Sequence, residues 1–326
     1  MLKRLTHFFQ RRGTLMFFTK PLLQITIKHF SNSRAVRNMV QEVDLKLSDR
    51  ETFLNTLQAR RLMEDRIIYV DVGARGGPQG IISSFHGILF FIICEADEAE
   101  CRSLKLRYPK EQSLFLEVAL ADQVAKRNLY LTRKPGCSSL LKPTGNALAL
   151  RGGNERDLAR FEIVNQVEIE TSPLYLCIPK TIKHIDILKI DVQGFEFEIL
   201  SGLGDFRPVL IVAECSAAEL YTDQKSIFSV GSLLEKHGYM ALKLMETQLV
   251  PKTCAKFQSS IQIHGDVIFV PDNSANGIAI IERDVEKWFA ALCMHGYMDF
   301  ALWQIEELKI RKPELITQTE ELLRKS

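Results

Sequence analysis

The 326-residue sequence lacks an uninterrupted apolar run of the length that a membrane-spanning helix requires. In the first 40 residues, the apolar stretches are broken by Lys20, Pro21 and Lys28, short of the roughly 20 uncharged residues that cross a bilayer. The same segment contains eight Lys or Arg but no Asp or Glu, and no small-residue cleavage site follows it. Residues 1–40 are therefore expected either to form a helical cap on the domain or to lie on an anionic membrane surface.

Two further absences narrow the class of protein. The net charge is only +2 at pH 7, so the sequence has no basic surplus of the kind that nucleic-acid binders carry. The seven cysteines are scattered without a C-x-x-C pair, which disfavours both a disulfide framework and a metal site. Reduced thiols and ordinary proportions of apolar and charged residues are typical of a soluble cytoplasmic protein. If the protein contacts a membrane, residues 1–40 are the segment expected to do so.

What the sequence does contain is an alternation of strand-like and helix-like segments. Seven runs have strand character, at residues 67–70, 88–94, 114–120, 185–190, 209–213, 240–245 and 267–270. Runs that are apolar on both faces and separated by crossover segments, such as residues 98–108 and 195–201, predict a parallel sheet covered by helices. The predicted fold class is α/β, with a doubly wound, mostly parallel seven-stranded sheet of the Rossmann-like kind.

The expected organisation of the chain has three parts. Residues 1–64 form a basic N-terminal helical extension, residues 65–275 the α/β domain, and residues 276–326 a C-terminal helical extension. Within the domain, residues 133–180 carry Pro-Gly and Gly-Gly turn signals and are expected to form a lid or an insertion.

The first strand runs into a glycine-rich turn, DVGARGGP at residues 71–78. Glycine lets the backbone bend sharply and approach a ligand, and a helix that follows would aim its free N–H groups at an anionic group. The dinucleotide pattern G-x-G-x-x-G is missing, because Arg75 and Pro78 stand where glycines are required, and this disfavours a nicotinamide oxidoreductase. The spacing Asp-x-Gly-x-x-x-Gly instead resembles the first motif of S-adenosylmethionine-dependent methyltransferases.

Acidic residues follow the next strands. Glu95 ends the second strand, where a carboxylate accepts hydrogen bonds from the ribose hydroxyls of an adenosine ligand; a solvated strand-end carboxylate is the alternative. Asp71 is expected to fix the turn or to meet the ligand's ammonium group. Ala119, Leu120 and Asp122 close the third strand and are expected to face an adenine edge, with a plain turn aspartate as the alternative.

The fourth strand ends in KIDVQG at residues 189–194. Lys189 and Asp191 alternate with apolar residues, so both are expected on one face of the sheet. Together with the glycine turn, this segment resembles the FkbM family of methyltransferases, whose hallmark is Lys-Ile-Asp-Val-Glu-Gly followed by a helical Glu and Val-Leu. The resemblance covers about residues 65–245, and Gln193 stands in place of the family's common Glu.

The resemblance implies transfer of a methyl group from S-adenosyl-L-methionine to a hydroxyl of a sugar, glycan or natural product. Asp191 is the first candidate for the base that activates the hydroxyl, Lys189 would bind the acceptor oxygen or tune a carboxylate, and Glu214 is the third candidate. No metal is expected. The implied cofactor-binding residues are Asp71, Gly73, Ala74, Gly77, Glu95, Ala96, Ala119, Leu120 and Asp122.

Several alternatives remain open at this stage. A Lys189–Asp191 ion pair that only shapes the turn would leave Lys189 without a catalytic role. His184, His237 and His264 are candidate bases that nothing in their local sequence singles out. A non-catalytic protein that binds an adenosyl ligand, or a membrane-surface scaffold with the same fold, is the other class to consider. The expected partner is a small-molecule or glycan acceptor and not a nucleic acid.

Overall fold

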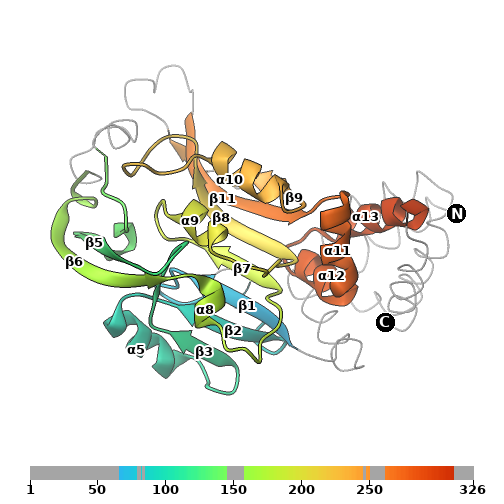
Figure 1. The fold of residues 1–326 in the computed structure, drawn as a ribbon, viewed down its shortest axis with the longest axis horizontal. Coiled ribbons are helices and arrows are strands. Elements are labelled where there is room, and N and C mark those ends of the chain that lie inside the picture. Colours follow the sequence, from blue (N-terminus) through green and yellow to red (C-terminus); the bar gives the residue numbers. More distant parts are fainter. Residues whose placement is uncertain are drawn as a thin grey trace, which may run out of the picture. The chain divides into compact units, whose positions relative to one another are not determined.

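A computed structural model describes residues 66–78, 82, 85–144, 158–244, 247–249 and 261–311. The predicted N-terminal extension, residues 1–64, lies outside them, and so does its expected cap or membrane role. The chain divides into two compact units, Met63–His295 and a second that joins Met1–Leu62 to Gly296–Ser326. In the second unit, the described element is helix α13 (Met298–Arg311), in which the rings of Phe300 and Trp303 pack 5.6 Å apart (Figure 1).

One mixed sheet forms the centre of the larger unit (Figure 1). Its neighbouring strands are, in order, β3 (Ser113–Leu116), β2 (Leu89–Cys94), β1 (Ile67–Val72), β7 (Ile187–Ile190), β8 (Leu210–Ser216) and β11 (Ile261–Pro271). The first five are parallel, and β11 runs antiparallel to β8. Opposite β8, the far edge of β11 pairs with β9 (Tyr239–Leu244) and with the short β10 (Thr247–Leu249). The predicted mostly parallel α/β sheet is confirmed, with β10 as an eighth strand.

The parallel strands form where the apolar runs were predicted, because their residues are buried on both faces. Helices follow them on either side: α5 (Glu98–Arg107) packs against β3, and α9 (Glu196–Ser201) and α10 (Ile227–Glu235) pack against β8. After the last strand, α11 (Ala275–Arg283) packs on β11 and α12 (Val285–Met294) on β8. In the part of the chain that the structure describes, no helix is both long and apolar enough to span a bilayer.

The predicted third strand, residues 114–120, is wrong in its second half. Ser113–Leu116 is β3, but Ala119–Leu120 is β4, which belongs to a separate sheet. Glu117 ends the run: its carboxylate pairs with Lys105 of α5 at the surface, directly after a strand whose last three residues are only partly buried.

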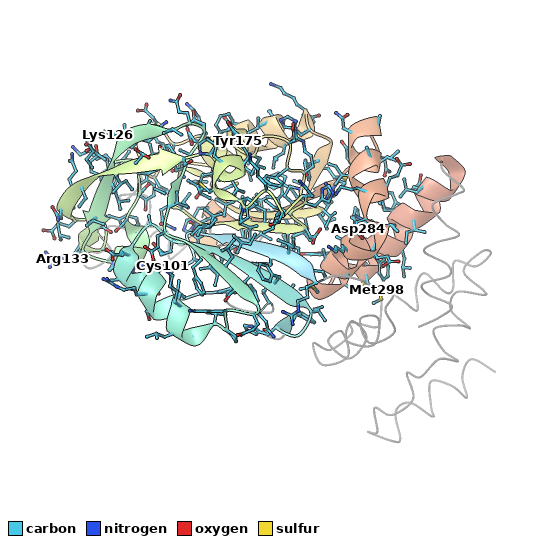
Figure 2. All side chains as sticks on the ribbon, turned by 60° about the horizontal axis from the view of Figure 1, so that its bottom comes forward. Cys101, Lys126, Arg133, Tyr175, Asp284 and Met298 are labelled. Atoms are coloured by element: carbon cyan, nitrogen blue, oxygen red, sulfur yellow. The ribbon has the colours of Figure 1, made fainter. Side chains whose placement is uncertain are left out.

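In the second sheet, β4 pairs with β6 (Ile163–Ser172), and β6 pairs antiparallel with β5 (Ala125–Thr132). Of these strands, β6 alone lies within residues 133–180, so the expected lid or insertion stays a prediction. Lys126 and Arg133, labelled in Figure 2, lie on this ribbon and pair with Glu168 at 2.9 Å and Glu162 at 2.6 Å. Residues 145–157 of the predicted lid lie outside the described residues.

The helix expected directly after the glycine turn falls mostly on residues 79–81, 83 and 84, which lie outside the described residues. Gly76 and Gly77 have φ of 84° and 79°, a left-handed conformation that a right-handed helix cannot contain. The turn as far as Gly77 is therefore not part of a helix.

At the amino edge of the sheet, one buried carboxylate fastens α12 to the strands. Asp186, just before β7, accepts a hydrogen bond from the backbone N–H of Ile68 at 2.8 Å. Its other partner is the Lys287 ammonium on α12, 3.2 Å away. Burial raises the pKa of Asp186, while Lys287 and the Ile68 N–H oppose that shift.

Candidate active site

The carboxyl edge of the same sheet gathers the charged residues that the sequence predicted. The strand register places Asp71 opposite Lys189, and Lys189 opposite Val212, two residues before Glu214. Because neighbouring residues in register point to one face, all three charged side chains lie on the same side of the sheet. The Lys189 ammonium lies 3.5 Å from Asp71 Oδ1 and 3.4 Å from Asp191 Oδ2, so it joins two carboxylates.

Burial and this shared ammonium set the charges of the cluster. Burial raises the pKa of Asp71, against the opposing charge of Lys189. Burial alone would lower the pKa of Lys189, but the charges of Asp71 and Asp191 outweigh it and raise that pKa. For Asp191, burial is outweighed by Lys189 and by the amide of Gln193, and its pKa is lowered. Lys189 therefore stays an ammonium and Asp191 a carboxylate at neutral pH.

Glu214 extends the cluster toward β11. Its Oε2 accepts a hydrogen bond from Gln193 Nε2 at 2.6 Å, and its Oε1 lies 3.2 Å from Nδ1 of His264. Burial raises the pKa of Glu214, the bond to His264 opposes this, and Asp191 adds to it. Asp191 and Glu214 are thus a pair whose pKa values are pushed in opposite directions, a pattern typical of acid–base sites.

The carboxylates of Asp71, Asp191 and Glu214 differ in the exposed fraction of their side chains. The side chain of Asp191 is 37% exposed, that of Glu214 22% and that of Asp71 2%. Asp191 is therefore the carboxylate that an incoming acceptor reaches most directly, whereas Asp71 can act only from behind Lys189.

The glycine turn packs directly against this cluster. The N–H groups of Gly73 and Ala74 donate to the carbonyl of Cys94 at the end of β2. Gly73 has φ of 74°, and a Cβ there would overlap the carbonyl oxygen of Asp191. The missing side chain thus brings the two sequence motifs into contact, rather than only clearing room for a ligand.

Arg75, in the glycine turn, is held by α5. Its guanidinium pairs with Asp97 at 2.7 Å and with Glu100 at 3.7 Å, and Glu100 also accepts the N–H of Gly76. Asp97 caps α5 through the N–H groups of Ala99 and Glu100, and the Arg75 guanidinium lowers the pKa of Asp97. The arginine therefore ties the turn to the helix that follows β2.

Glu95 is buried beside this turn. Its Oε1 accepts the backbone N–H of Asp97 at 2.9 Å, and Oε2 accepts no hydrogen bond from the described residues. Burial raises its pKa, against the Asp97 N–H and the charge of Arg75.

Ala96, next along the chain, is exposed. Gly77 lies under the ring of Tyr108, where a Cβ would clash with the phenol group.

The residues predicted to face adenine lie in the second sheet. Ala119 and Leu120 are buried in β4, and Asp122 follows them. Asp122 Oδ1 accepts a bond from Arg127 at 2.9 Å, and that guanidinium lies over the ring of Phe195, 5.1 Å from its centroid. Asp122 thus has a partner within the chain, and its contact with adenine stays a prediction.

Three residues of the site were missed or left undistinguished by sequence reasoning. His264 reaches Glu214 only because β11 pairs antiparallel with β8, with Asp266 opposite Glu214. Gln193 bridges Asp191 and Glu214, and Tyr221 contacts Gln193 from the loop after β8. The only local signal was at Gln193, which stands in the strand-end motif; the other two depend on chain pairing that no local pattern encodes.

His184 and His237 lie away from this cluster, beside Asp186 and Arg207 respectively.

A glycine turn after β1 and acidic residues after β2, after β7 and within β8, on a parallel sheet with an antiparallel last strand, define a Rossmann-like methyltransferase fold. The sequence model of the methyltransferase FkbM domain matches residues 71–240, more than half of the chain, and the chain belongs to this family.

Solved structures with detectable similarity include other methyltransferases. The FkbM methyltransferase from Methylobacillus flagellatus KT has 12% identity and a TM-score of 0.33, over 76% of this chain and 58% of that protein. This chain thus spans less than two thirds of the Methylobacillus protein. Precorrin-6y C5,15-methyltransferase from Geobacter metallireducens GS-15 has 13% identity and a TM-score of 0.31, over 70% and 90% of the two chains.

A third similar structure is 1,6-didemethyltoxoflavin-N1-methyltransferase from Burkholderia thailandensis, solved with 1,6-didemethyltoxoflavin and S-adenosylhomocysteine. It has 8% identity and a TM-score of 0.30, over 76% of this chain and 88% of that one. No curated protein matches the sequence.

Proposed function

We propose that this protein transfers the methyl group of S-adenosyl-L-methionine to a hydroxyl group of a sugar, glycan or natural product. One observation carries the proposal: Asp191, the most exposed carboxylate of the cluster, is kept ionised by Lys189 and Gln193 next to the glycine turn. A carboxylate at such an edge can take the proton of an acceptor hydroxyl.

The residues beside the turn fit an adenosyl cofactor. Glu95 is buried and keeps Oε2 without a hydrogen-bond donor among the described residues, whereas Asp71 Oδ1 already has the Lys189 ammonium 3.5 Å away. Glu95 would bind the ribose and Asp71 would fix the turn from behind Lys189, with Gly73, Ala74, Gly77 and Ala96 lining the turn between them. When bound, the cofactor supplies an electrophilic methyl group. Ala119, Leu120 and Asp122 are proposed for the adenine side.

The chain's own residues would then prepare the acceptor. Asp191 receives the hydroxyl proton, and Glu214, whose pKa is raised mainly by burial, shares that proton with it. The Lys189 ammonium, 3.4 Å from Asp191 Oδ2, stabilises the negative charge that develops on the acceptor oxygen. Holding these groups in place contributes to the rate by alignment as well as by charge.

The test compares cells that carry the wild-type gene with cells that carry Asp191→Asn. Mass spectrometry of their metabolites and glycans is expected to find a species one methyl group heavier only with the wild type. Equilibrium dialysis with S-adenosylmethionine is run on both purified proteins. Binding without any methylated product would favour the non-catalytic adenosyl-binding alternative.

Residues 1–40 remain a prediction of either a packed cap or a membrane-surface segment. Liposome flotation of the full chain against a chain that lacks residues 1–40 separates these two roles. Anionic vesicles that carry the full chain but not the shortened one would support peripheral membrane contact.

A further inference from the structure

We propose that Gln193 is a positioning residue that ties the carboxylates of Asp191 and Glu214 together and links the pair, through Tyr221, to the loop of residues 137–144. What the pair does in catalysis rests on the proposed function, whereas the contacts themselves do not.

The amide of Gln193 makes one bond to each carboxylate. Its Nε2 donates to Asp191 Oδ1 at 3.0 Å and to Glu214 Oε2 at 2.6 Å. An amide nitrogen carries two hydrogens, so both bonds form at the same time, and bonds to ionised acceptors are the strong kind. A Glu at this position would lack these hydrogens when ionised and would add a third negative charge.

The backbone conformation at Gln193 shows that the surrounding residues hold its side chain in this position. Gln193 has φ of 62°, a left-handed conformation that is costly for a residue with a side chain, and Gly194 follows with φ of 107°. The buried carboxylate of Glu196 accepts the N–H groups of Val192 at 3.2 Å and Gly194 at 3.1 Å, which fixes the turn on both sides of Gln193. Such a conformation persists where the surroundings over-determine it.

Tyr221 holds the other end of the amide. Its hydroxyl lies 3.0 Å from Gln193 Oε1 and 3.1 Å from the carbonyl oxygen of Cys137, and its single proton is donated to one of them at a time. The ring is buried in a small apolar cluster with Cys137, Phe161 and Leu220. The loop that contains Cys137 thus reaches the carboxylate pair through two side chains.

Backbone bonds fasten that loop to the segment carrying Tyr221. The N–H of Thr144 donates to the carbonyl of Leu220 at 2.9 Å, and the N–H of Thr222 donates to the carbonyl of Lys142 at 2.8 Å. Because the loop lies between β5 and β6 and Tyr221 follows β8, the arrangement connects the second sheet to the charged cluster.

The test is a titration of the full chain labelled with ¹³C at the Asp and Glu carboxyl carbons and followed by NMR. The Asp191 and Glu214 signals are assigned with D191N and E214Q. In Gln193→Glu, the pKa of Asp191 is expected to rise by about one unit or more, since a donor is lost and a like charge is gained. Gln193→Met, which removes the donors without adding charge, is expected to raise it by a smaller amount.

Gln224→Glu is the matched control, because Gln224 sits in the neighbouring loop and uses its Oε1 to accept the N–H groups of Leu220 and Tyr221. It adds the same charge nearby without a bond to the pair, so the pKa of Asp191 should move by less than about 0.3 units. An Asp191 pKa that stays at the wild-type value in both Gln193 variants overturns the proposal. So does a shift in the control as large as in Q193E.

The NMR readout needs no acceptor, so it stands apart from the proposed function. Once a substrate is in hand, the acid limb of the kcat/KM profile of Q193M should move by the same amount as the Asp191 pKa. Normal methylation with an unmoved Asp191 pKa refutes the role of Gln193 alone. A shifted pKa in a protein without methyl-transfer activity keeps the role of Gln193 and refutes the function. If Q193E does not fold, the neutral Q193M decides the question.

Discussion

Asp186 and Asp191 stand at the two ends of the same four-residue strand, β7, and they have opposite surroundings. Asp186 is enclosed, with the Ile68 N–H and the Lys287 ammonium as its partners. Asp191 keeps 37% of its side chain exposed and shares Lys189 with Asp71 and Gln193 with Glu214. An enclosed carboxylate with its partners around it fastens structure, whereas a carboxylate with an open side can exchange a proton.

Glu196 gives a third case, in the same turn as Asp191. It is buried like Asp186, but backbone N–H groups rather than an ammonium are its partners, and burial raises its pKa to about 8. Burial raises the pKa of both carboxylates, and the charge of Lys287 opposes that shift at Asp186 only.

The largest expected effect is at the open end of β7. Asp191→Asn keeps the shape and a hydrogen-bond acceptor but removes the base, so turnover should fall by roughly 10²- to 10⁴-fold. Affinity for S-adenosylmethionine should stay within about tenfold, or 1.4 kcal/mol, in calorimetry. Unchanged turnover would remove Asp191 from the mechanism and erase the contrast between the two ends of the strand.

At the Asp186 end of β7, Lys287→Met should lower the free energy of unfolding and should not change the methyl-transfer activity. It strands the Asp186 carboxylate in the interior, which typically costs about 3–5 kcal/mol in the free energy of unfolding. The double variant D186N/K287M should recover part of that loss in urea unfolding. A loss below about 1 kcal/mol in K287M would show that the pair is not what secures α12.

A smaller effect is expected for Glu95→Ala. Loss of a carboxylate that binds the ribose hydroxyls should weaken S-adenosylmethionine binding by about 1.5–3 kcal/mol, roughly 10- to 150-fold. Glu98→Ala, which removes an exposed glutamate three residues away, is the control and should not change the affinity. Equal calorimetric affinities for E95A and the wild type would falsify the ribose role.

The smallest effect is the change in folding stability over one pH unit that the buried carboxylate of Glu196 should cause. Between the ordinary glutamate pKa of 4.5 and about 8, the folded chain keeps a proton on Glu196 that the unfolded chain releases. Stability from this group is therefore complete below pH 4.5 and is lost as pH rises toward 8, by at most about 1.4 kcal/mol per pH unit. Glu196→Gln keeps the acceptor oxygen and should remove that slope. Parallel stability curves for E196Q and the wild type between pH 6 and 7 would contradict the raised pKa.

The sequence permitted prediction of the parts of the fold whose signal is local. The strands β1, β2, β7 and β8 are largely apolar runs, so their positions and their parallel pairing followed from composition and spacing. The run at 114–120 misled because its apolar residues look continuous, whereas the strand ends at Leu116 and the exposed Glu117 pairs with Lys105. The helix start that the glycine turn indicated lies mostly outside the described residues.

The residues of the site also fall into two groups, those that a local sequence signal predicted and those that it did not. Asp71, Glu95, Lys189, Asp191 and Glu214 were foreseeable because parallel strands bring their carboxyl ends to one edge. The contact of His264 with Glu214 was not, since it depends on the register of an antiparallel pair about 50 residues apart in sequence. The link from Tyr221 to Gln193 depends on how a loop folds back, and no periodicity encodes that.

The overlap that any side chain at Gly73 would have with the Asp191 carbonyl limits how this protein can be redesigned. A substitution meant to reshape the donor pocket at that glycine would push the base out of place, so the two halves of the site cannot be altered independently there. Efforts to change acceptor preference are better directed at the loop of residues 137–144, whose link to the carboxylates runs through the side chains of Tyr221 and Gln193 and not through a direct backbone contact with Asp191.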